Sequence, residues 1–174
     1  LLASGLTASF VVAGLSAWRL LHAGEDVSAR KTLHTGLVLA AVLAPLQIFV
    51  GDLLGLNTLE HQPAKIAAIE AIWKTGKGVP LVLFAIPDDD SRRNDYAIEI
   101  PKGSSLILKH AADAEVKGIA AFAPNVAPVA PVFFAFRMMV GMGVLMLALA
   151  WAGAWATRRG MLPARWLLWA LAGS

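Results

Sequence analysis

Glu60 to Lys74 reads EHQPAKIAAIEAIWK, and this polar run, with Gly51-Asp52 before it, lies between two long apolar parts of the chain. Pro63 suits the first turn of a helix, because the N–H group that proline lacks would have no helical partner there. Residues 63–75 are therefore predicted to form a helix that lies at a membrane surface. Gly51-Asp52 is predicted to end the apolar segment that precedes it.

The composition indicates a helical membrane protein. Of 174 residues, 57% are hydrophobic and 16% are charged, whereas soluble domains carry about 25% charged residues. Leu1–Trp18 and Val140–Thr157 contain no charge, and an uncharged apolar run of about 18 residues is typical of a membrane span. The net charge of +3 does not indicate a nucleic-acid partner. The chain has no cysteine, which excludes disulfides, thiolate metal sites and cysteine nucleophiles.

We predict an all-α membrane protein, with three full spans and the start of a fourth in a transmembrane helix bundle. Residues 1–52 form two spans, 132–157 form the third, and 158–174 form a turn and the start of a truncated fourth. Residues 53–131 form an excursion outside the membrane that is too long to lack structure of its own. Within it, residues 80–86 are predicted to form an apolar strand or buried turn, and residues 96–101 a short extended segment. Because the chain begins and stops inside apolar runs, we expect it to be a piece of a longer polytopic protein.

Basic residues predict the orientation. Arg30 and Lys31 lie in the loop after the first span, and Arg158 and Arg159 lie in the loop after the third. Two spans separate these loops, so both lie on one side, and short basic loops face the cytoplasm. The excursion 53–131 is therefore predicted to be periplasmic, in a bacterial inner membrane.

Lys65 and Glu70 have two interpretations. Five helical residues place them about 140° apart, so they form no direct pair, but both side chains could flank a ligand. Quinol oxidation needs a group that accepts a phenolic proton and one that hydrogen-bonds the opposite oxygen, and a carboxylate and an ammonium suit these roles. The alternative is a surface helix in which Glu70 pairs with Lys74, a contact worth roughly 0.2–0.5 kcal/mol.

Arg137, Met138 and Met139 are a second candidate. Arg137 lies about 9 Å beyond Pro131 along a helix, and a charge at that depth is a functional hypothesis by default. Arginine could neutralise a haem propionate, and a methionine thioether can bind haem iron opposite a histidine. The alternative is an arginine that extends to the interface beside two methionines that fill space.

Three further features have open interpretations. Asp52 is expected to have a structural role at a helix end, and it could instead pair with a basic residue of the excursion or act in a proton exit. His34 is predicted to lie at the membrane interface, and the alternative is a ligand to a metal or haem. Small residues of the first span, such as Ala13 and Gly14, could allow either close helix packing or the approach of a flat cofactor.

The motifs resemble subunit I of the cytochrome bd-type quinol oxidases. The resemblance is carried by GLSAW at 14–18, Gly51-Asp52, QPAKIAAIE at 62–70, FAIP at 84–87, PVAP at 128–131 and FAFRMMV at 134–140. It implies that residues 53–131 are a quinol-binding loop of the short variety, which includes the cyanide-insensitive type. Lys65 and Glu70 match the quinol-site pair of the family, Met139 its ligand to haem b558, and Arg137 its arginine near that haem.

The resemblance further implies a function and the partners of this piece. The function is that of a quinol:oxygen oxidoreductase, a terminal respiratory oxidase in which quinol is oxidised and dioxygen is reduced to water. The partners are quinol, dioxygen, the lipid bilayer and a second oxidase subunit. The histidine opposite Met139 would precede Leu1, and the ligands of haems b595 and d would lie outside this piece. The alternative function is a haem-free transporter or sensor whose excursion binds a ligand.

Overall fold

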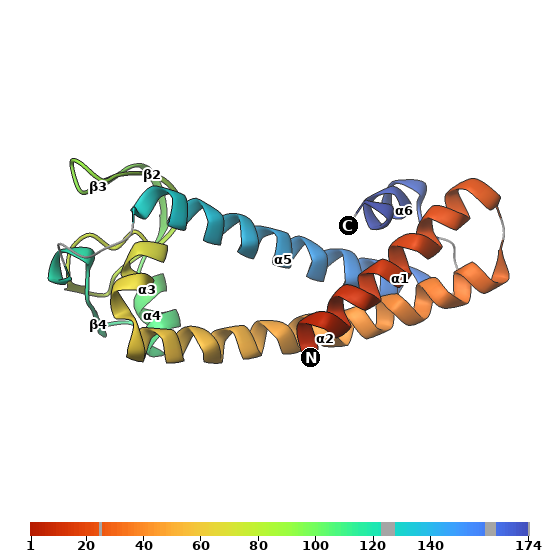
Figure 1. The fold of residues 1–174 in the computed structure, drawn as a ribbon, viewed down its shortest axis with the longest axis horizontal. Helices are drawn as coiled ribbons and strands as arrows, with labels where there is room; N and C mark the ends of the chain where they lie inside the picture. The colour runs from red at the N-terminus through yellow and green to blue at the C-terminus, as the bar shows by residue number, and fades with distance from the viewer. Residues whose placement is uncertain (25, 123–127, 159–162, 174) are drawn as a thin grey trace. The chain divides into compact units, whose positions relative to one another are not determined.

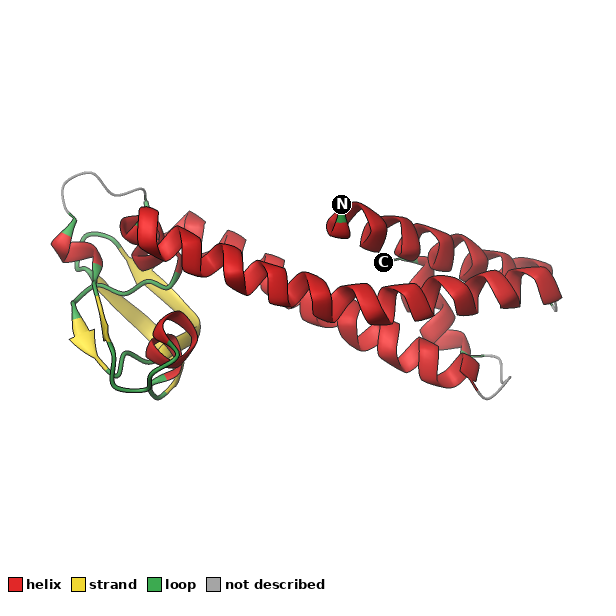
Figure 2. Cartoon of the chain, turned by 90° about the horizontal axis from the view of Figure 1, so that it is seen from below, coloured by secondary structure: helices red, strands yellow, loops and turns green. Residues whose placement is uncertain are grey.

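The computed structural model describes residues 1–24, 26–122, 128–158 and 163–173. Figure 1 shows the elements in chain order, and most of them are helices. The helices are α1 (Leu2–Ala23), α2 (Val27–His61), α3 (Pro63–Ile69), α4 (Gly103–Lys109), α5 (Val129–Arg158) and α6 (Arg165–Ala172), with a 3-10 turn η1 (Ile119–Ala121). The strands are β1 (Gly76–Lys77), β2 (Leu81–Asp88), β3 (Arg93–Ile100) and β4 (Glu115–Val116). Figure 2 shows the strands within the excursion alone.

Helices α1, α2 and α5 are each long and apolar enough to cross a membrane. This confirms the predicted class of helical membrane protein. The chain divides into two compact units. We call residues 1–50 with 141–174 the span unit, and residues 51–140 the loop unit.

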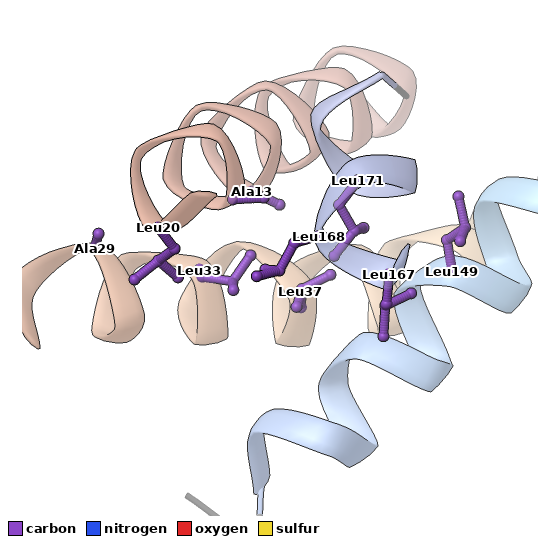
Figure 3. Close-up of a cluster of buried hydrophobic side chains, with 10 residues drawn as sticks. Ala13, Leu20, Ala29, Leu33, Leu37, Leu149, Leu167, Leu168 and Leu171 are labelled. Atoms are coloured by element: carbon purple, nitrogen blue, oxygen red, sulfur yellow. The ribbon is translucent and has the colours of Figure 1, made fainter. Parts of the chain in front are cut away.

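The span unit is held together by small and aliphatic side chains. Its core contains leucines and alanines from α1, α2, α5 and α6 (Figure 3). Gly36 of α2 lies so close to α1 that a Cβ atom there would be 3.0 Å from the backbone oxygen of Ser9. A Cβ atom on Gly14 of α1 would be 3.0 Å from the backbone oxygen of Leu171. The small residues of the first span therefore serve close helix packing, which was one of the two predicted roles.

Helix α2 is capped by a side chain at its start and ends later than the sequence predicted. The Asp26 carboxylate accepts hydrogen bonds from the backbone N–H groups of Ser28, at 2.8 Å, and Ala29, at 3.2 Å, and so caps the helix. The helix continues through Gly51-Asp52 to His61, so the prediction of a helix end at Gly51-Asp52 was wrong. The apolar residues 53–56 continue the helical run, and no proline follows until Pro63.

The loop unit adds two small antiparallel sheets to the helices. Strands β2 and β3 form a hairpin in which Leu81 pairs with Ile100 and Asp88 with Arg93, and β1 pairs with β4. The two extended segments predicted at 80–86 and 96–101 fall within this hairpin. Its buried residues Val82 and Ala85 pack with Ala67 and Ala68 of α3 and with Phe133 of α5.

One residue used in the sequence analysis is not covered. Arg159, one of the basic residues used for orientation, lies outside the described residues. The periplasmic placement of the excursion therefore stays a prediction.

Candidate functional site

Glu70 ends helix α3, which is shorter than the predicted helix 63–75. The backbone N–H of Ile72 donates to the carbonyl of Ala67 at 2.9 Å, and that of Ala71 donates to Ala68 at 3.2 Å. This pair of bonds is the Schellman motif, which requires a left-handed residue after the helix cap. Ala71 takes that position with φ 51°. Glycine is usual there, so the sequence carried no visible stop signal, and the predicted helix was too long.

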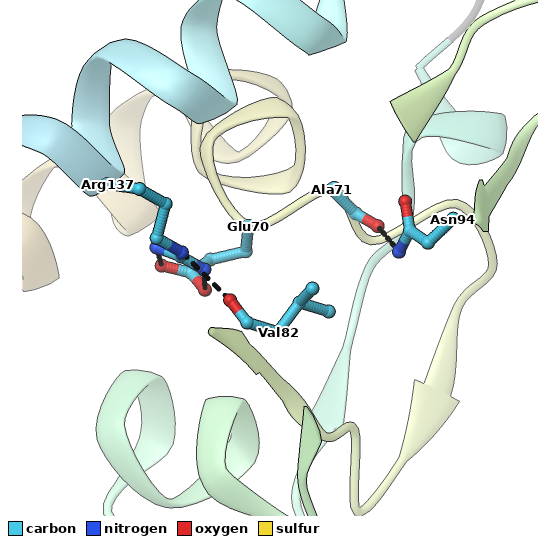
Figure 4. Close-up of polar contacts among 5 residues, drawn as sticks. All are labelled: Glu70, Ala71, Val82, Asn94 and Arg137. Atoms are coloured by element: carbon cyan, nitrogen blue, oxygen red, sulfur yellow. Dashed lines mark hydrogen bonds and ion pairs between the residues drawn. The ribbon is translucent and has the colours of Figure 1, made fainter. Parts of the chain in front are cut away.

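The Glu70 carboxylate binds the guanidinium of Arg137, 67 residues further along the chain (Figure 4). Glu70 Oε2 accepts a hydrogen bond from Arg137 Nη2 at 2.8 Å, and Oε1 accepts a longer one from Nη1 at 3.4 Å. The side chains are 9% and 16% exposed, respectively. A two-point contact of this kind fixes both the distance and the orientation of the groups. The alternative pairing of Glu70 with Lys74 on one helix is not formed, because α3 ends before Lys74.

Arg137 is held by more than the carboxylate. Its Nε donates to the backbone carbonyl of Val82 on β2 at 2.8 Å, and its guanidinium carbon lies 4.7 Å from the centre of the Phe133 ring. Desolvation of a buried ion pair is costly unless other bonds complete it, and these contacts supply them. Arg137 is therefore an ion-paired and hydrogen-bonded residue of the loop unit.

Met139 lies two residues beyond Arg137 on α5, and its side chain is 63% exposed in this chain. Met138 is 73% exposed, so neither methionine fills a core within the described residues. A thioether that is open to the surroundings has the donor chemistry and the accessibility that an axial haem ligand requires. Exposure does not distinguish Met139 from Met138, so the assignment of Met139 to haem b558 stays a prediction.

Lys65 lies on α3 with an exposed side chain, whereas Glu70 is buried. Across the ranges that the structure covers, no hydrogen bond or ion pair joins the two residues. The arrangement thus brings together Glu70 and Arg137, one from each predicted candidate group, and leaves Lys65 at the surface of the same short helix.

Asp52 and His34 have partners in their own units. Asp52 Oδ2 lies 3.9 Å from His110 Nε2 in the loop unit, as in one of its two alternative interpretations. The expected role at a helix end was wrong, because α2 continues past Asp52. His34 Nδ1 lies 2.9 Å from Thr157 Oγ1 in the span unit.

Two contributors to the site were missed from the sequence. Val82 acts through a backbone carbonyl, which no side-chain pattern can reveal. Asn94 on β3 donates from Nδ2 to the carbonyl of Ala71 at 3.0 Å, and its Oδ1 accepts from Trp73 Nε1 at 2.7 Å. Asn94 follows two arginines in a charged segment, and nothing in that segment distinguished it from a solvated turn.

Comparisons with known proteins agree with the resemblance. The family described as cytochrome bd terminal oxidase subunit I matches residues 1–174. The chain is 27% identical to cytochrome bd ubiquinol oxidase subunit 1 of Bacillus subtilis (strain 168), over 93% of this chain and 37% of that protein. It is 31% identical to cytochrome bd-II ubiquinol oxidase subunit 1 of Escherichia coli (strain K12), over 68% of this chain and 23% of that protein.

A solved structure shows the same fold. The bd oxidase from Geobacillus thermodenitrificans matches with a TM-score of 0.85 and 28% identity, over 97% of this chain and 39% of that chain. The chain thus spans about a third of the length of the relatives it matches. The apolar helices and the relatives together identify part of a multi-pass bacterial membrane protein. The match over the whole sequence establishes that the chain belongs to the cytochrome bd terminal oxidase subunit I family.

Proposed function

We propose that this chain is part of the catalytic subunit of a quinol:oxygen oxidoreductase that serves as a terminal respiratory oxidase. Each quinol releases two electrons and two protons, and each dioxygen takes up four electrons and four protons to give two waters. Two quinols are therefore oxidised for each dioxygen reduced. Quinol is oxidised at the loop unit, beside Lys65 and Glu70.

The observation that carries the proposal is the ion pair between Glu70 and Arg137. It joins the carboxylate of the quinol loop to the helix that bears Met139, and all three residues lie within the loop unit. Proton acceptance and electron transfer from one quinol need both partners near the same ring. The pair supplies a fixed connection of that kind between the two candidate groups.

Glu70 accepts a phenolic proton from the quinol, and Arg137 holds its carboxylate in one orientation before the quinol arrives. A group positioned in advance in this way loses less freedom in the transition state. Lys65 is exposed on the same helix, and its ammonium hydrogen-bonds the opposite oxygen of the quinol.

Met139 would hold haem b558 through its thioether sulfur, and Arg137, two residues earlier on the same helix, would lie beside it. When bound, the haem supplies a one-electron acceptor whose potential depends on its axial ligands. The loop unit lies on the periplasmic side, so the protons of quinol leave there. The complete oxidase also contains haems b595 and d, held outside this chain, and a second subunit in the bacterial inner membrane.

The first test compares two electron donors in the intact oxidase. Glu70→Gln should lower quinol-driven oxygen consumption by about 100-fold, a typical loss for a proton-transfer group, and leave consumption with an artificial reductant near the native rate. Lys65→Leu should act in the same direction. Glu60→Gln changes an exposed carboxylate of the same loop and serves as the control. An equal loss with both donors would assign Glu70 to folding instead.

The second test concerns the haem ligand. Met139→Leu should remove the low-spin b-type absorption of the purified oxidase. Met138→Leu alters the neighbouring exposed methionine and should leave this absorption intact. An unchanged spectrum in the Met139 variant would refute the assignment. Membership of the oxidase family leaves no observation that favours the haem-free transporter or sensor.

A further inference from the structure

The backbone turn directly after Glu70 adopts a conformation that its residue type disfavours. Ala71 has φ 51° and is 1% exposed. The left-handed conformation brings the Cβ atom of an L-residue close to the following carbonyl oxygen. Such a residue persists only where its surroundings hold it, and these positions concentrate at functional sites.

Asn94 is the side chain that holds this turn. Its Nδ2 donates to the Ala71 carbonyl at 3.0 Å, and its Oδ1 accepts from Trp73 Nε1 at 2.7 Å (Figure 4 shows the first bond). The orientation of the amide is unambiguous, because a carbonyl can only accept and an indole N–H can only donate. Asn94 thus connects two points of the chain that lie one and three residues after Glu70.

The strand that carries Asn94 is paired with the strand that contacts Arg137. Asn94 pairs with Pro87 across the hairpin, and Val82 of the same β2 strand accepts the hydrogen bond from Arg137 Nε. One hairpin therefore contacts both sides of the ion pair. Strand β2 contacts the arginine directly, and strand β3 contacts the turn from which the glutamate projects.

We propose that Asn94 is a positioning residue for quinol oxidation. It fixes the carbonyl of Ala71, keeps the left-handed turn in place, and so sets the direction in which the Glu70 carboxylate leaves the end of α3. Asn94 acts through Glu70 and does not itself contact the quinol. This inference rests on the proposed role of Glu70 as proton acceptor.

Asn94→Asp in the intact oxidase is the main test, since it keeps the shape and the acceptor facing Trp73 but replaces the donor facing Ala71 by an oxygen. We expect kcat with quinol to fall between about tenfold and 100-fold, the range that a small misplacement of a reacting group produces. KM should change less, because the fault lies in proton acceptance and not in binding. The rate with an artificial reductant and the b-type haem spectrum should stay native.

Rescue distinguishes positioning from general damage. Glycine adopts positive φ without strain, so Ala71→Gly combined with Asn94→Asp should restore quinol turnover to within about threefold of native. Trp73→Phe keeps an aromatic ring and removes the donor to Asn94, and should produce a smaller loss than Asn94→Asp. Asp95→Asn changes the next residue of β3, which forms an exposed pair with Arg93, and should leave turnover unchanged.

The outcomes separate this inference from the proposed function. If Glu70→Gln slows quinol turnover but Asn94→Asp and Trp73→Phe do not, the positioning role is wrong and the function of Glu70 stands. If Glu70→Gln has no effect on quinol turnover, the proposed role of Glu70 is wrong, and the positioning role of Asn94 that rests on it is wrong too. Loss of the haem spectrum in Asn94→Asp that the added Ala71→Gly does not restore would also overturn the inference, because the defect would then not act through the turn.

Discussion

The two units of the chain are stabilised in different ways. The span unit is packed through small and aliphatic side chains, as at Gly36 against Ser9. The loop unit contains every non-glycine residue with positive φ among the described residues: Ala71, Arg92, Tyr96, Lys102 and His110. It also contains the buried ion pair between Glu70 and Arg137.

The difference shows which amino-acid substitutions each unit can tolerate. Helices in lipid gain stability from close contact of backbones, so the span unit depends on the absence of side chains at a few positions. The loop unit depends on particular polar groups that hold an unfavourable backbone. Substitutions that add atoms should therefore damage the span unit, and substitutions that remove polar groups should damage the loop unit.

The largest effect is expected from Arg137→Leu in the loop unit. It leaves the Glu70 carboxylate, on a side chain that is 9% exposed, without its partner, and removal of one member of a buried pair costs about 3–5 kcal/mol. Resistance of the loop to protease in the purified oxidase should fall accordingly. The combination Glu70→Gln with Arg137→Gln should recover much of it, because no buried charge remains.

The control for this prediction is the exposed ion pair of the same unit. Lys102 Nζ lies 2.6 Å from Asp113 Oδ1, with side chains 56% and 78% exposed, and surface pairs contribute about 0–1 kcal/mol. Lys102→Met should therefore have little effect on protease resistance. An equal effect of the two variants would show that burial of the polar network is not what stabilises the loop unit.

An intermediate effect is expected from Gly36→Ala in the span unit. The added Cβ would lie 3.0 Å from Ser9 O and 3.2 Å from Ala13 N, and backbone atoms of α1 cannot move aside cheaply. Such overpacking costs about 1–3 kcal/mol. Gly51→Ala on the same helix meets no atom within 4 Å and should stabilise the helix by up to about 1 kcal/mol. The unfolding temperature of the oxidase in detergent measures both effects. Equal changes of this temperature in the two variants would contradict the packing argument.

The smallest effect is expected from acid at the hairpin turn. Hydrogen bonds from the Ser91 side chain and then its N–H lower the pKa of Asp88 from its ordinary value of 3.8. A carboxyl whose folded pKa is depressed stabilises the fold above its unfolded pKa and loses that contribution as pH falls through the folded value. Below about pH 3.8, cleavage of the hairpin by pepsin should therefore rise more steeply in the native chain than in Asp88→Asn. If pepsin cleavage depends on pH in the same way in the native chain and in Asp88→Asn, Asp88 does not have this role.

The sequence predicted the spans well because their cause is local. Long uncharged apolar runs must pair all backbone groups internally, and a helix does this within one segment. The cap at Asp26 was predictable for the same reason, since its partners Ser28 and Ala29 are two and three residues away. The end of α2 was not, because glycine and aspartate at 51–52 only weaken a helix that the following apolar residues continue.

The sequence identified individual residues of the site but not the contacts between them. Glu70 and Arg137 were each identified as candidate site residues, but 67 residues separate them, and no periodic pattern relates positions so far apart. The Ala71 turn was missed because an alanine occupies a position where glycine usually marks the end of a helix. Asn94 was missed because its role depends on where the hairpin places it.

The pairing of β2 with β3 bears on how this loop can change length during evolution. The ladder ends at Asp88 and Arg93, and one residue inserted inside either strand would turn its side chains to the opposite face. Asn94 or the Val82 carbonyl would then leave the site. Residues added at the tip, near Ser91, lie outside the ladder and would disturb neither. Insertions that enlarge the loop unit without loss of activity are therefore expected at the tip of the hairpin.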